Sequence, residues 1–204
     1  IRAVLAARNL GKEATLLLIC SYGILSSRAA DLLAEAGFTN VYTVIDGFDE
    51  MARNVGILAE GFGILGRPVL ISEQYPKGLG HTVAEVEERL PAFTDRVEKM
   101  RFSACGVDAF EEALTWARCT SWVVCGIETH VCVNQTVHDL LERDYQVHVA
   151  EDAVSSRAVG NTRIGLEKML AAGARSTSAE MALFEMLEVA GGDDARGGER
   201  GVGE

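Results

Sequence analysis

The sequence predicts an α/β protein whose core is a three-layer, doubly wound and mostly parallel sheet. Short β-rich runs alternate with longer stretches whose apolar positions repeat with a helical period. Apolar residues make up 48% and charged residues 24% of the 204 positions, a composition typical of globular domains. Strands that alternate with helices in this way build a parallel sheet with helices on both faces.

The first fifty residues predict a small βαβ unit. Ser26 or Ser27 can cap a central helix, and Gly37 can end it. The expected order is a short helix at 2–9, a strand at 15–19, a helix at 27–36 and a strand at 41–45. Two parallel strands joined by a helix therefore precede the main body of the chain.

The main body repeats the alternation. Two of the three prolines, with Gly78 and Gly80, fall in residues 73–94, so this segment is expected to be a long loop with at most a short helix at 83–90. Helices are expected at 49–65, 108–117, 129–143, 162–172 and 179–189, and strands at 69–72, 96–99, 121–125, 145–150 and 174–177. Residues 191–204 are rich in glycine and are predicted to be a disordered tail without function.

Charge and cysteine content narrow the function. With 30 acidic against 19 basic side chains the net charge is −11, which disfavours binding to nucleic acid or to an anionic membrane. The longest apolar run, at 15–20, is far shorter than a membrane helix. An odd number of cysteines without CxxC spacing favours a reduced, cytoplasmic protein, and small-molecule chemistry becomes the leading class. The cysteines are Cys20, Cys105, Cys119, Cys125 and Cys132.

Residues 16–50 resemble the second half of a rhodanese (sulfurtransferase) domain. In that family a strand delivers a persulfide cysteine to an anion-binding loop, and Cys20 stands at this place, with Gly23 and Ser26 also matching. The loop usually carries two arginines, which are Ser21 and Leu25 here, and the first half of the domain is missing. The resemblance is therefore partial, over residues 1–50.

Residues 51–190 resemble the isochorismatase-like cysteine hydrolase superfamily, which includes nicotinamidases and carbamoyl-amide hydrolases. The matching segments are ISEQYPKGLGHT at 71–82, EKMRFSA at 98–104, VVCGIETHVCVNQTVHDLLERDYQVHVAEDAVSSR at 123–157 and STSAEMALFEML at 176–187. They lie in the family's order. The resemblance implies the isochorismatase-like hydrolase fold and a cysteine nucleophile.

The resemblance places the nucleophile at Cys132, in the first turn of a helix, and the catalytic lysine at Lys99. A helix N-terminus and a nearby ammonium both stabilise a thiolate, which is the reactive form of a cysteine. It also implies an oxyanion hole made by the backbone N–H groups of Glu128 and Cys132, beside a cis peptide bond between Ile127 and Glu128. The Glu128 side chain is expected at the pocket rim or in a salt bridge.

The family's third catalytic residue is an aspartate at the end of its first strand, and here the rhodanese-like segment replaces that strand. The candidate is Asp46, which ends the strand expected at 41–45 and precedes Asn54 by eight residues. Active sites of doubly wound sheets lie at such carboxyl ends. The two strands expected before residue 50 compete for one central position in the sheet. Either the extra strand is expected at an edge, or the rhodanese-like segment is expected to fold poorly.

No cofactor and no catalytic metal are expected. The four histidines, His81, His130, His138 and His148, lack the Asp-x-His arrangement of metal-binding nicotinamidases. The resemblance places substrate-pocket residues in the long loop, namely Glu73, Gln74, Tyr75 and Pro76. Family members commonly assemble as dimers or larger, so a homo-oligomer is expected.

Three functions are therefore carried forward. The first is hydrolysis of a small amide or carbamoyl C–N bond through a thioester at Cys132. The second is sulfur transfer at Cys20, and the third is an inactive family member that serves as an oligomeric scaffold or binding module. A thiol-reactive probe separates the first from the third, because only an activated cysteine reacts faster than a free thiol.

Overall fold

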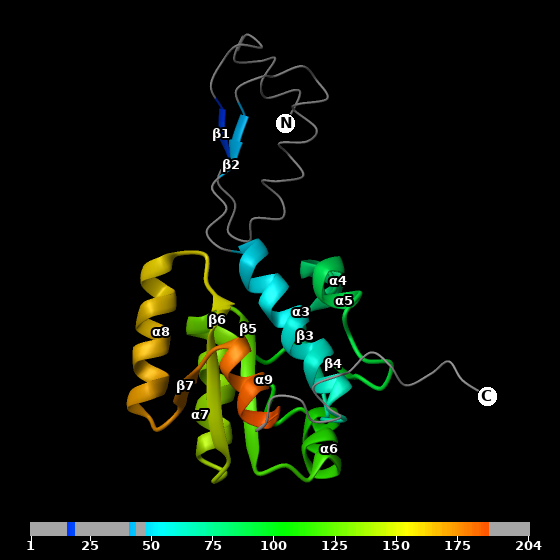
Figure 1. The fold of residues 1–204 in the computed structure, drawn as a ribbon. Helices are drawn as coiled ribbons and strands as arrows, with labels where there is room; N and C mark the ends of the chain where they lie inside the picture. The colour runs from blue at the N-terminus through cyan, green and yellow to red at the C-terminus, as the bar shows by residue number, and fades with distance from the viewer. Residues whose placement is uncertain (1–15, 19–40, 44–47, 188–204) are drawn as a thin grey trace, which may run out of the picture.

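The computed structural model describes residues 16–18, 41–43 and 48–187 (Figure 1). Strands and helices alternate along the described chain. In order, the elements are β1 (Leu16–Leu18), β2 (Val41–Thr43), α3 (Phe48–Ile64), β3 (Leu70–Gln74), α4 (Pro76–Leu79), α5 (Ala84–Glu87), β4 (Asp95–Lys99), α6 (Asp108–Ala117), β5 (Ser121–Ile127), the π-helix η1 (Thr129–Val133), α7 (Asn134–Leu141), β6 (Gln146–Ser155), α8 (Val159–Ala171), β7 (Arg175–Thr177) and α9 (Ala179–Leu187).

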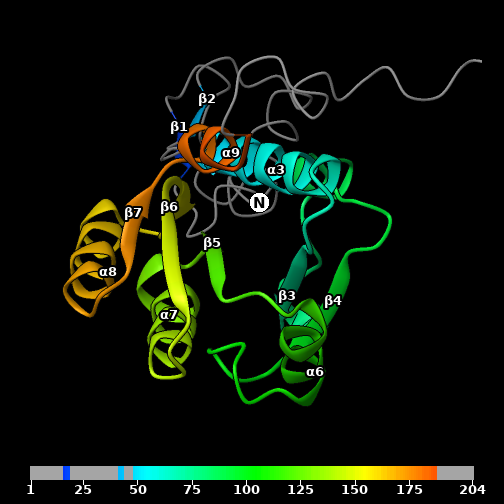
Figure 2. The ribbon, with the colours of Figure 1, turned by 60° about the horizontal axis from the view of Figure 1, so that its bottom comes forward.

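The helices lie on two faces of the strands, as the prediction of a three-layer α/β fold requires. Figure 2 shows α3 and α9 along one face and α6, α7 and α8 along the other. β6 serves both faces: Val147, Val149 and Val154 join the core that α6, α7 and α8 cover, whereas Ala150 and Ala153 pack against α3 and α9. Neighbouring residues of a strand point to opposite faces, so this strand is buried on both sides.

All strand pairs in the described residues are parallel, but they do not form the single sheet that the sequence predicts. Hydrogen bonds join β1 to β2, β3 to β4, and β5 to β6 and β7, which gives three separate sheets. β1 and β2 pair with each other, in the register Leu16 to Val41, and neither joins β3 to β5. Neither β1 nor β2 therefore occupies the central position between β3 and β5.

The segment at 73–94 is more ordered than predicted. β3 continues through Gln74, and the turns α4 and α5 follow it. α4 has four residues, which is too short to leave a helical period in the sequence. The short helix expected at 83–90 is confirmed as α5, while the end of β3 and the turn α4 occupy residues that were expected to be loop.

The helix expected at 129–143 begins as the π-helix η1, and α8 packs closely on it. A Cβ atom at Gly165 of α8 would lie 3.1 Å from the Cα and N atoms of His130 and 3.2 Å from the carbonyl carbon of Thr129. Backbone atoms cannot move aside as a flexible side chain can, so the close contact between α8 and η1 requires a glycine at position 165.

Gly165→Ala is therefore expected to lower the free energy of unfolding by about 1 kcal/mol or more, because overpacking outweighs the helix propensity that alanine gains. Gly160→Ala on the same helix is the matched control, since a Cβ atom there would have no neighbour within 4 Å. Urea denaturation checks both variants. Equal stability of the two would contradict the packing argument.

No helix among the described residues is long and apolar enough to cross a membrane.

Candidate active site

Cys132 lies in the π-helix that follows the carboxyl end of β5. The carbonyl oxygen of Glu128, the residue before this helix, accepts hydrogen bonds from the N–H groups of Val131 (3.0 Å) and Val133 (3.2 Å). Single π-turns of this kind are frequent at functional sites. The half-buried thiol of Cys132 is thus held at the carboxyl ends of the strands, where doubly wound folds have their active sites.

The last residues of β3 and β4 bring a second and a third side chain to this cysteine. Gln74 and Lys99 are in register across the two strands, and the Lys99 ammonium donates a 2.7 Å hydrogen bond to the Gln74 Oε1 atom. The Cys132 thiol lies 3.8 Å from the same oxygen and donates to it. The Gln74 side-chain amide donates to the carbonyl oxygen of Met100 at 2.9 Å, which fixes its orientation.

Lys99 is only 5% exposed, and its ammonium has three acceptors. Besides the Gln74 oxygen, the carbonyl oxygens of Arg101 (3.1 Å) and Phe102 (2.7 Å) accept from it. Burial lowers the pKa of Lys99, and the charge of Cys132 and a hydrogen bond with it oppose that effect. An ammonium with three fixed neutral acceptors is suited to stabilising a thiolate by its charge.

A short segment after β4 holds the two carbonyl oxygens that bind Lys99. The N–H group of Ala104 donates to the Thr136 hydroxyl oxygen at 3.0 Å, and the Ser103 hydroxyl donates to Asp139 at 2.6 Å. Both partners lie on α7, the helix that follows Cys132. The helix that directly follows the thiol therefore also positions the segment that holds the acceptors of Lys99.

The Ile127–Glu128 peptide bond is cis, at the position where the sequence places it. The Glu128 carboxylate forms a salt bridge with Arg157, one of the two alternatives expected for it. Arg157 itself was not singled out by the sequence, because a lone arginine after a strand carries no pattern.

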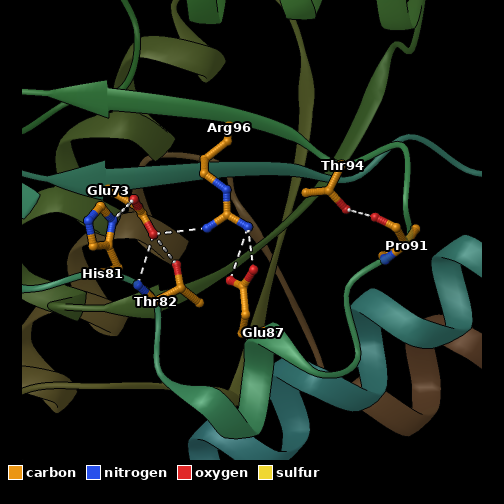
Figure 3. Close-up of polar contacts among 7 residues, drawn as sticks. All are labelled: Glu73, His81, Thr82, Glu87, Pro91, Thr94 and Arg96. Atoms are coloured by element: carbon orange, nitrogen blue, oxygen red, sulfur yellow. Dashed lines mark hydrogen bonds and ion pairs between the residues drawn. The ribbon is translucent and has the colours of Figure 1, made fainter.

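Glu73 does not share the face of Gln74. Adjacent residues of a strand point to opposite faces, so only one of the two can face Cys132, and the contacts show that it is Gln74. The buried Glu73 carboxylate instead accepts from His81 (2.9 Å), from the N–H (2.8 Å) and hydroxyl (2.6 Å) of Thr82, and from Arg96 (3.1 Å), as Figure 3 shows. The expectation that Glu73 lines the pocket is replaced by a structural assignment: it ties the segment at 75–82 to the sheet.

Tyr75 and Pro76 begin that segment. Tyr75 adopts a left-handed conformation (φ 43°) and its N–H group donates to the carbonyl oxygen of Lys99 at 2.9 Å. Its side chain is 45% exposed, whereas Pro76 is buried. The Tyr75 ring lies over Gly78, where a Cβ atom would clash with its Cε1 atom. The expected place of Tyr75 in the substrate pocket stays a prediction, while Pro76 has a packing role.

Hydrogen bonds outweigh burial in setting the pKa of the Glu73 carboxyl. Burial alone would raise the pKa of this carboxyl, but the hydrogen bonds from Thr82 and His81 and the charge of Arg96 lower it from 4.5 to about 2. A lowered pKa in the folded state stabilises the fold fully above about pH 4.5, and this contribution is lost as the pH falls toward 2.

Glu73→Gln is therefore expected to lower the free energy of unfolding by about 2 kcal/mol at neutral pH, since four donor groups lose a charged acceptor. The difference from wild type should shrink between pH 4.5 and pH 2. Glu60→Gln, which breaks an exposed pair with Arg89, is the control with little expected effect. A difference that stays constant over this pH range would contradict the assignment.

Asp46 and Cys20 lie outside the described residues. Within the described part of the chain, no group of three or more His, Cys, Asp or Glu side chains is placed to hold a metal ion. Burial raises the pKa of the Cys105 thiol to about 11, and burial with the nearby Asp152 charge raises that of Cys125 to about 11. These two thiols are thereby disfavoured as nucleophiles.

Comparison with known proteins identifies the family of this chain. The model of the isochorismatase domain matches residues 34–181, which is more than half of the chain. This chain belongs to the isochorismatase family. The secreted isochorismatase effector Isc1 of Phytophthora sojae is 42% identical over 132 residues, which cover 63% of this chain and 62% of the relative. The chain thus spans less than two thirds of that relative's length.

Solved structures give the same fold. The MAR1 ribonuclease from Caenorhabditis elegans superposes with a TM-score of 0.72 and 31% identity, over 92% of this chain and 88% of that one. The YcaC gene product from Escherichia coli, described as an octameric hydrolase of unknown specificity, has a TM-score of 0.66 and 19% identity, over 87% and 81%. The fold of this chain therefore matches that of both structures.

Proposed function

We propose that this protein is a cofactor-free cysteine hydrolase that cleaves the C–N bond of a small amide or carbamoyl compound through a thioester at Cys132. The observation that carries the proposal is the shared acceptor at Gln74: the thiol of Cys132 and the buried ammonium of Lys99 contact one oxygen at the carboxyl ends of the strands. A cation this close to a cysteine stabilises its thiolate.

The proposed reaction has two stages at Cys132, acylation and hydrolysis. Asp46 takes the thiol proton, the thiolate attacks the substrate carbonyl carbon, and the N–H groups of Glu128 and Cys132 bind the oxyanion that forms. The oxyanion collapses, the C–N bond breaks, and Asp46 passes its proton to the leaving nitrogen. Water, deprotonated by Asp46, then attacks the thioester, and the acid leaves as the thiol is restored.

Ammonia release from a panel of small primary amides and N-carbamoyl compounds tests the proposal. We expect release from at least one compound with wild type and none with Cys132→Ser. Absence of release from every compound, together with labelling of Cys132 no faster than that of a free thiol, would favour the inactive scaffold instead.

Asp46→Asn tests the proton shuttle. The expected result is a loss of turnover on the order of a hundredfold with an unchanged unfolding midpoint, because an amide cannot accept the proton. A crystal structure gives the geometric check: the Asp46 carboxylate should lie within about 4 Å of the Cys132 sulfur, the reach of a hydrogen bond. Full activity of the variant would remove Asp46 from the mechanism.

Two other activities are outcomes of the same tests. Cyanide-dependent thiocyanate formation that is lost in Cys20→Ser but kept in Cys132→Ser would indicate sulfur transfer. Ribonuclease activity, for which the nematode protein is named, is disfavoured here because a net charge of −11 repels RNA phosphates. Cleavage of a labelled single-stranded RNA by wild type would overturn this conclusion.

Assembly as a homo-oligomer belongs to the proposal. Exposed apolar side chains on α9, Met181 (52%) and Phe184 (63%), are of the kind that subunit contacts cover. The E. coli structure is described as octameric. Light scattering of the purified chain should give a mass above that of one subunit.

A further inference from the structure

The carboxylate of Glu128 is buried at the entry to the helix that carries Cys132, and a guanidinium holds it. Glu128 is 6% exposed. The Arg157 Nε atom donates to both carboxylate oxygens (2.9 and 3.0 Å), and its Nη2 atom donates to Oε2 (2.7 Å). A two-pronged pair of this kind fixes the plane of the carboxylate and its distance from the arginine.

The connection between β6 and α8, together with the first turn of α8, also contacts His130 of η1. The Nδ1 atom of His130 lies 3.0 Å from the Ser156 hydroxyl, and its Nε2 atom lies 3.3 Å from the Asn161 side-chain nitrogen. Gly165 of α8 lies directly against the His130 backbone. Residues 156–161 therefore grip both Glu128 and His130, the residues on either side of the fully buried Thr129.

The main chain of Glu128 also has a proposed role in catalysis. The N–H group of Glu128 is one of the two proposed oxyanion donors, and its carbonyl oxygen accepts from Val131 and Val133. A donor stabilises an oxyanion only while its direction is fixed before the charge develops. Removing the arginine would leave a buried carboxylate without its guanidinium partner, and the side chain would move toward water and take the peptide with it.

We propose that Arg157 is a positioning residue that acts through the Glu128 carboxylate to aim the Glu128 N–H group at the oxyanion. This inference rests on the proposed function. In this mechanism Arg157 acts through Glu128, so its effect is expected in the steps in which an oxyanion forms.

Two reactions of Cys132 isolate such a step. In acylation by 4-nitrophenyl acetate the thiolate attacks the carbonyl carbon, an oxyanion forms, and 4-nitrophenolate leaves. In alkylation by iodoacetamide the thiolate displaces iodide, and no oxyanion forms. A change in the fraction of Cys132 that is ionised alters both rates alike and cancels in the ratio of acylation to alkylation. A loss of oxyanion donors lowers only the acylation rate and therefore lowers this ratio.

Arg157→Gln should lower this ratio by about tenfold or more, since loss of one oxyanion donor costs on the order of a hundredfold. Arg157→Lys keeps the charge but loses the bidentate contact, so its ratio should lie between those of wild type and Arg157→Gln. Arg163→Gln is the matched control, because Arg163 forms an exposed pair with Glu167 on α8 and should leave the ratio unchanged. An unchanged ratio in Arg157→Gln would overturn the proposal.

Hydrogen exchange of the intact chain provides a readout that needs no activity. If Arg157 holds the main chain, amides at 128–133 should exchange at least about tenfold faster in Arg157→Gln than in Arg163→Gln. Equal exchange in the two variants would overturn the inference even where wild type acylates. Failure of wild type to acylate at Cys132, with the expected exchange difference intact, would instead count against the proposed function and leave Arg157 as the restraint on η1.

Discussion

Cys132→Ser is expected to abolish amide hydrolysis, with a loss of at least about a thousandfold in turnover. A serine hydroxyl at this position has no general base strong enough to ionise it, whereas the ammonium of Lys99 can stabilise a thiolate beside Gln74. Ammonia release measured with saturating substrate checks the prediction, and the unfolding midpoint of the variant should match that of wild type.

Cys119→Ser is the matched control for this substitution. Cys119 lies after α6, and its thiol donates to the carbonyl oxygen of Ala117 at 3.2 Å, away from Lys99 and Gln74. It should keep full turnover. Equal loss of activity in the two variants would mean that cysteine replacement acts through the fold and not through the nucleophile.

Lys99→Met is expected to have the second largest effect, a loss on the order of a hundredfold in the rate at which iodoacetamide alkylates Cys132 at neutral pH. Methionine fills the space of the lysine stem but supplies no charge. It also leaves the carbonyl oxygens of Arg101 and Phe102 without their donor. Mass spectrometry of the labelled peptide follows the reaction at Cys132 itself.

Lys168→Met, on the exposed side of α8, is the control that removes a lysine far from these contacts. We expect its alkylation rate to equal that of wild type. If Lys99→Met also reacted like wild type, the ammonium would be a structural group that satisfies three carbonyl acceptors, and another cation would have to stabilise the thiolate.

The sequence predicted most elements of the described chain because their apolar periods are long enough to recognise. The helix expected at 108–117 is confirmed as α6, which has the same bounds. The strand expected at 145–150 runs on to Ser155, through the charged pair Glu151 and Asp152. Charges of this kind usually mark the end of a strand, but here they fall where β6 shifts its register against β5.

The division into three sheets could not be predicted, because it depends on which strands pair with each other. β1 and β2 pair with each other, with Leu16 opposite Val41, and neither pairs with β3 or β5. Local sequence gives each strand its propensity but not its partner.

Some residues of the candidate site could likewise be predicted from the sequence, and others could not. The family resemblance supplied Lys99 and Cys132, and the structure brings both to Gln74. Strand alternation alone could have separated Gln74 from Glu73, because adjacent residues face opposite ways. The role of Arg157 had no sequence signal, since it depends on where the connection after β6 passes over the turn after β5.

The covalent intermediate gives the most direct test of the central claim. The protein is mixed with 4-nitrophenyl acetate, quenched in acid within the burst of nitrophenolate release, and digested for mass spectrometry. The account predicts one acetyl group, carried by the peptide that contains Cys132 and absent from it in Cys132→Ser. A burst that leaves the acetyl group on another residue, or product formation with Cys132 unmodified at every quench time, would contradict a thioester mechanism at this cysteine.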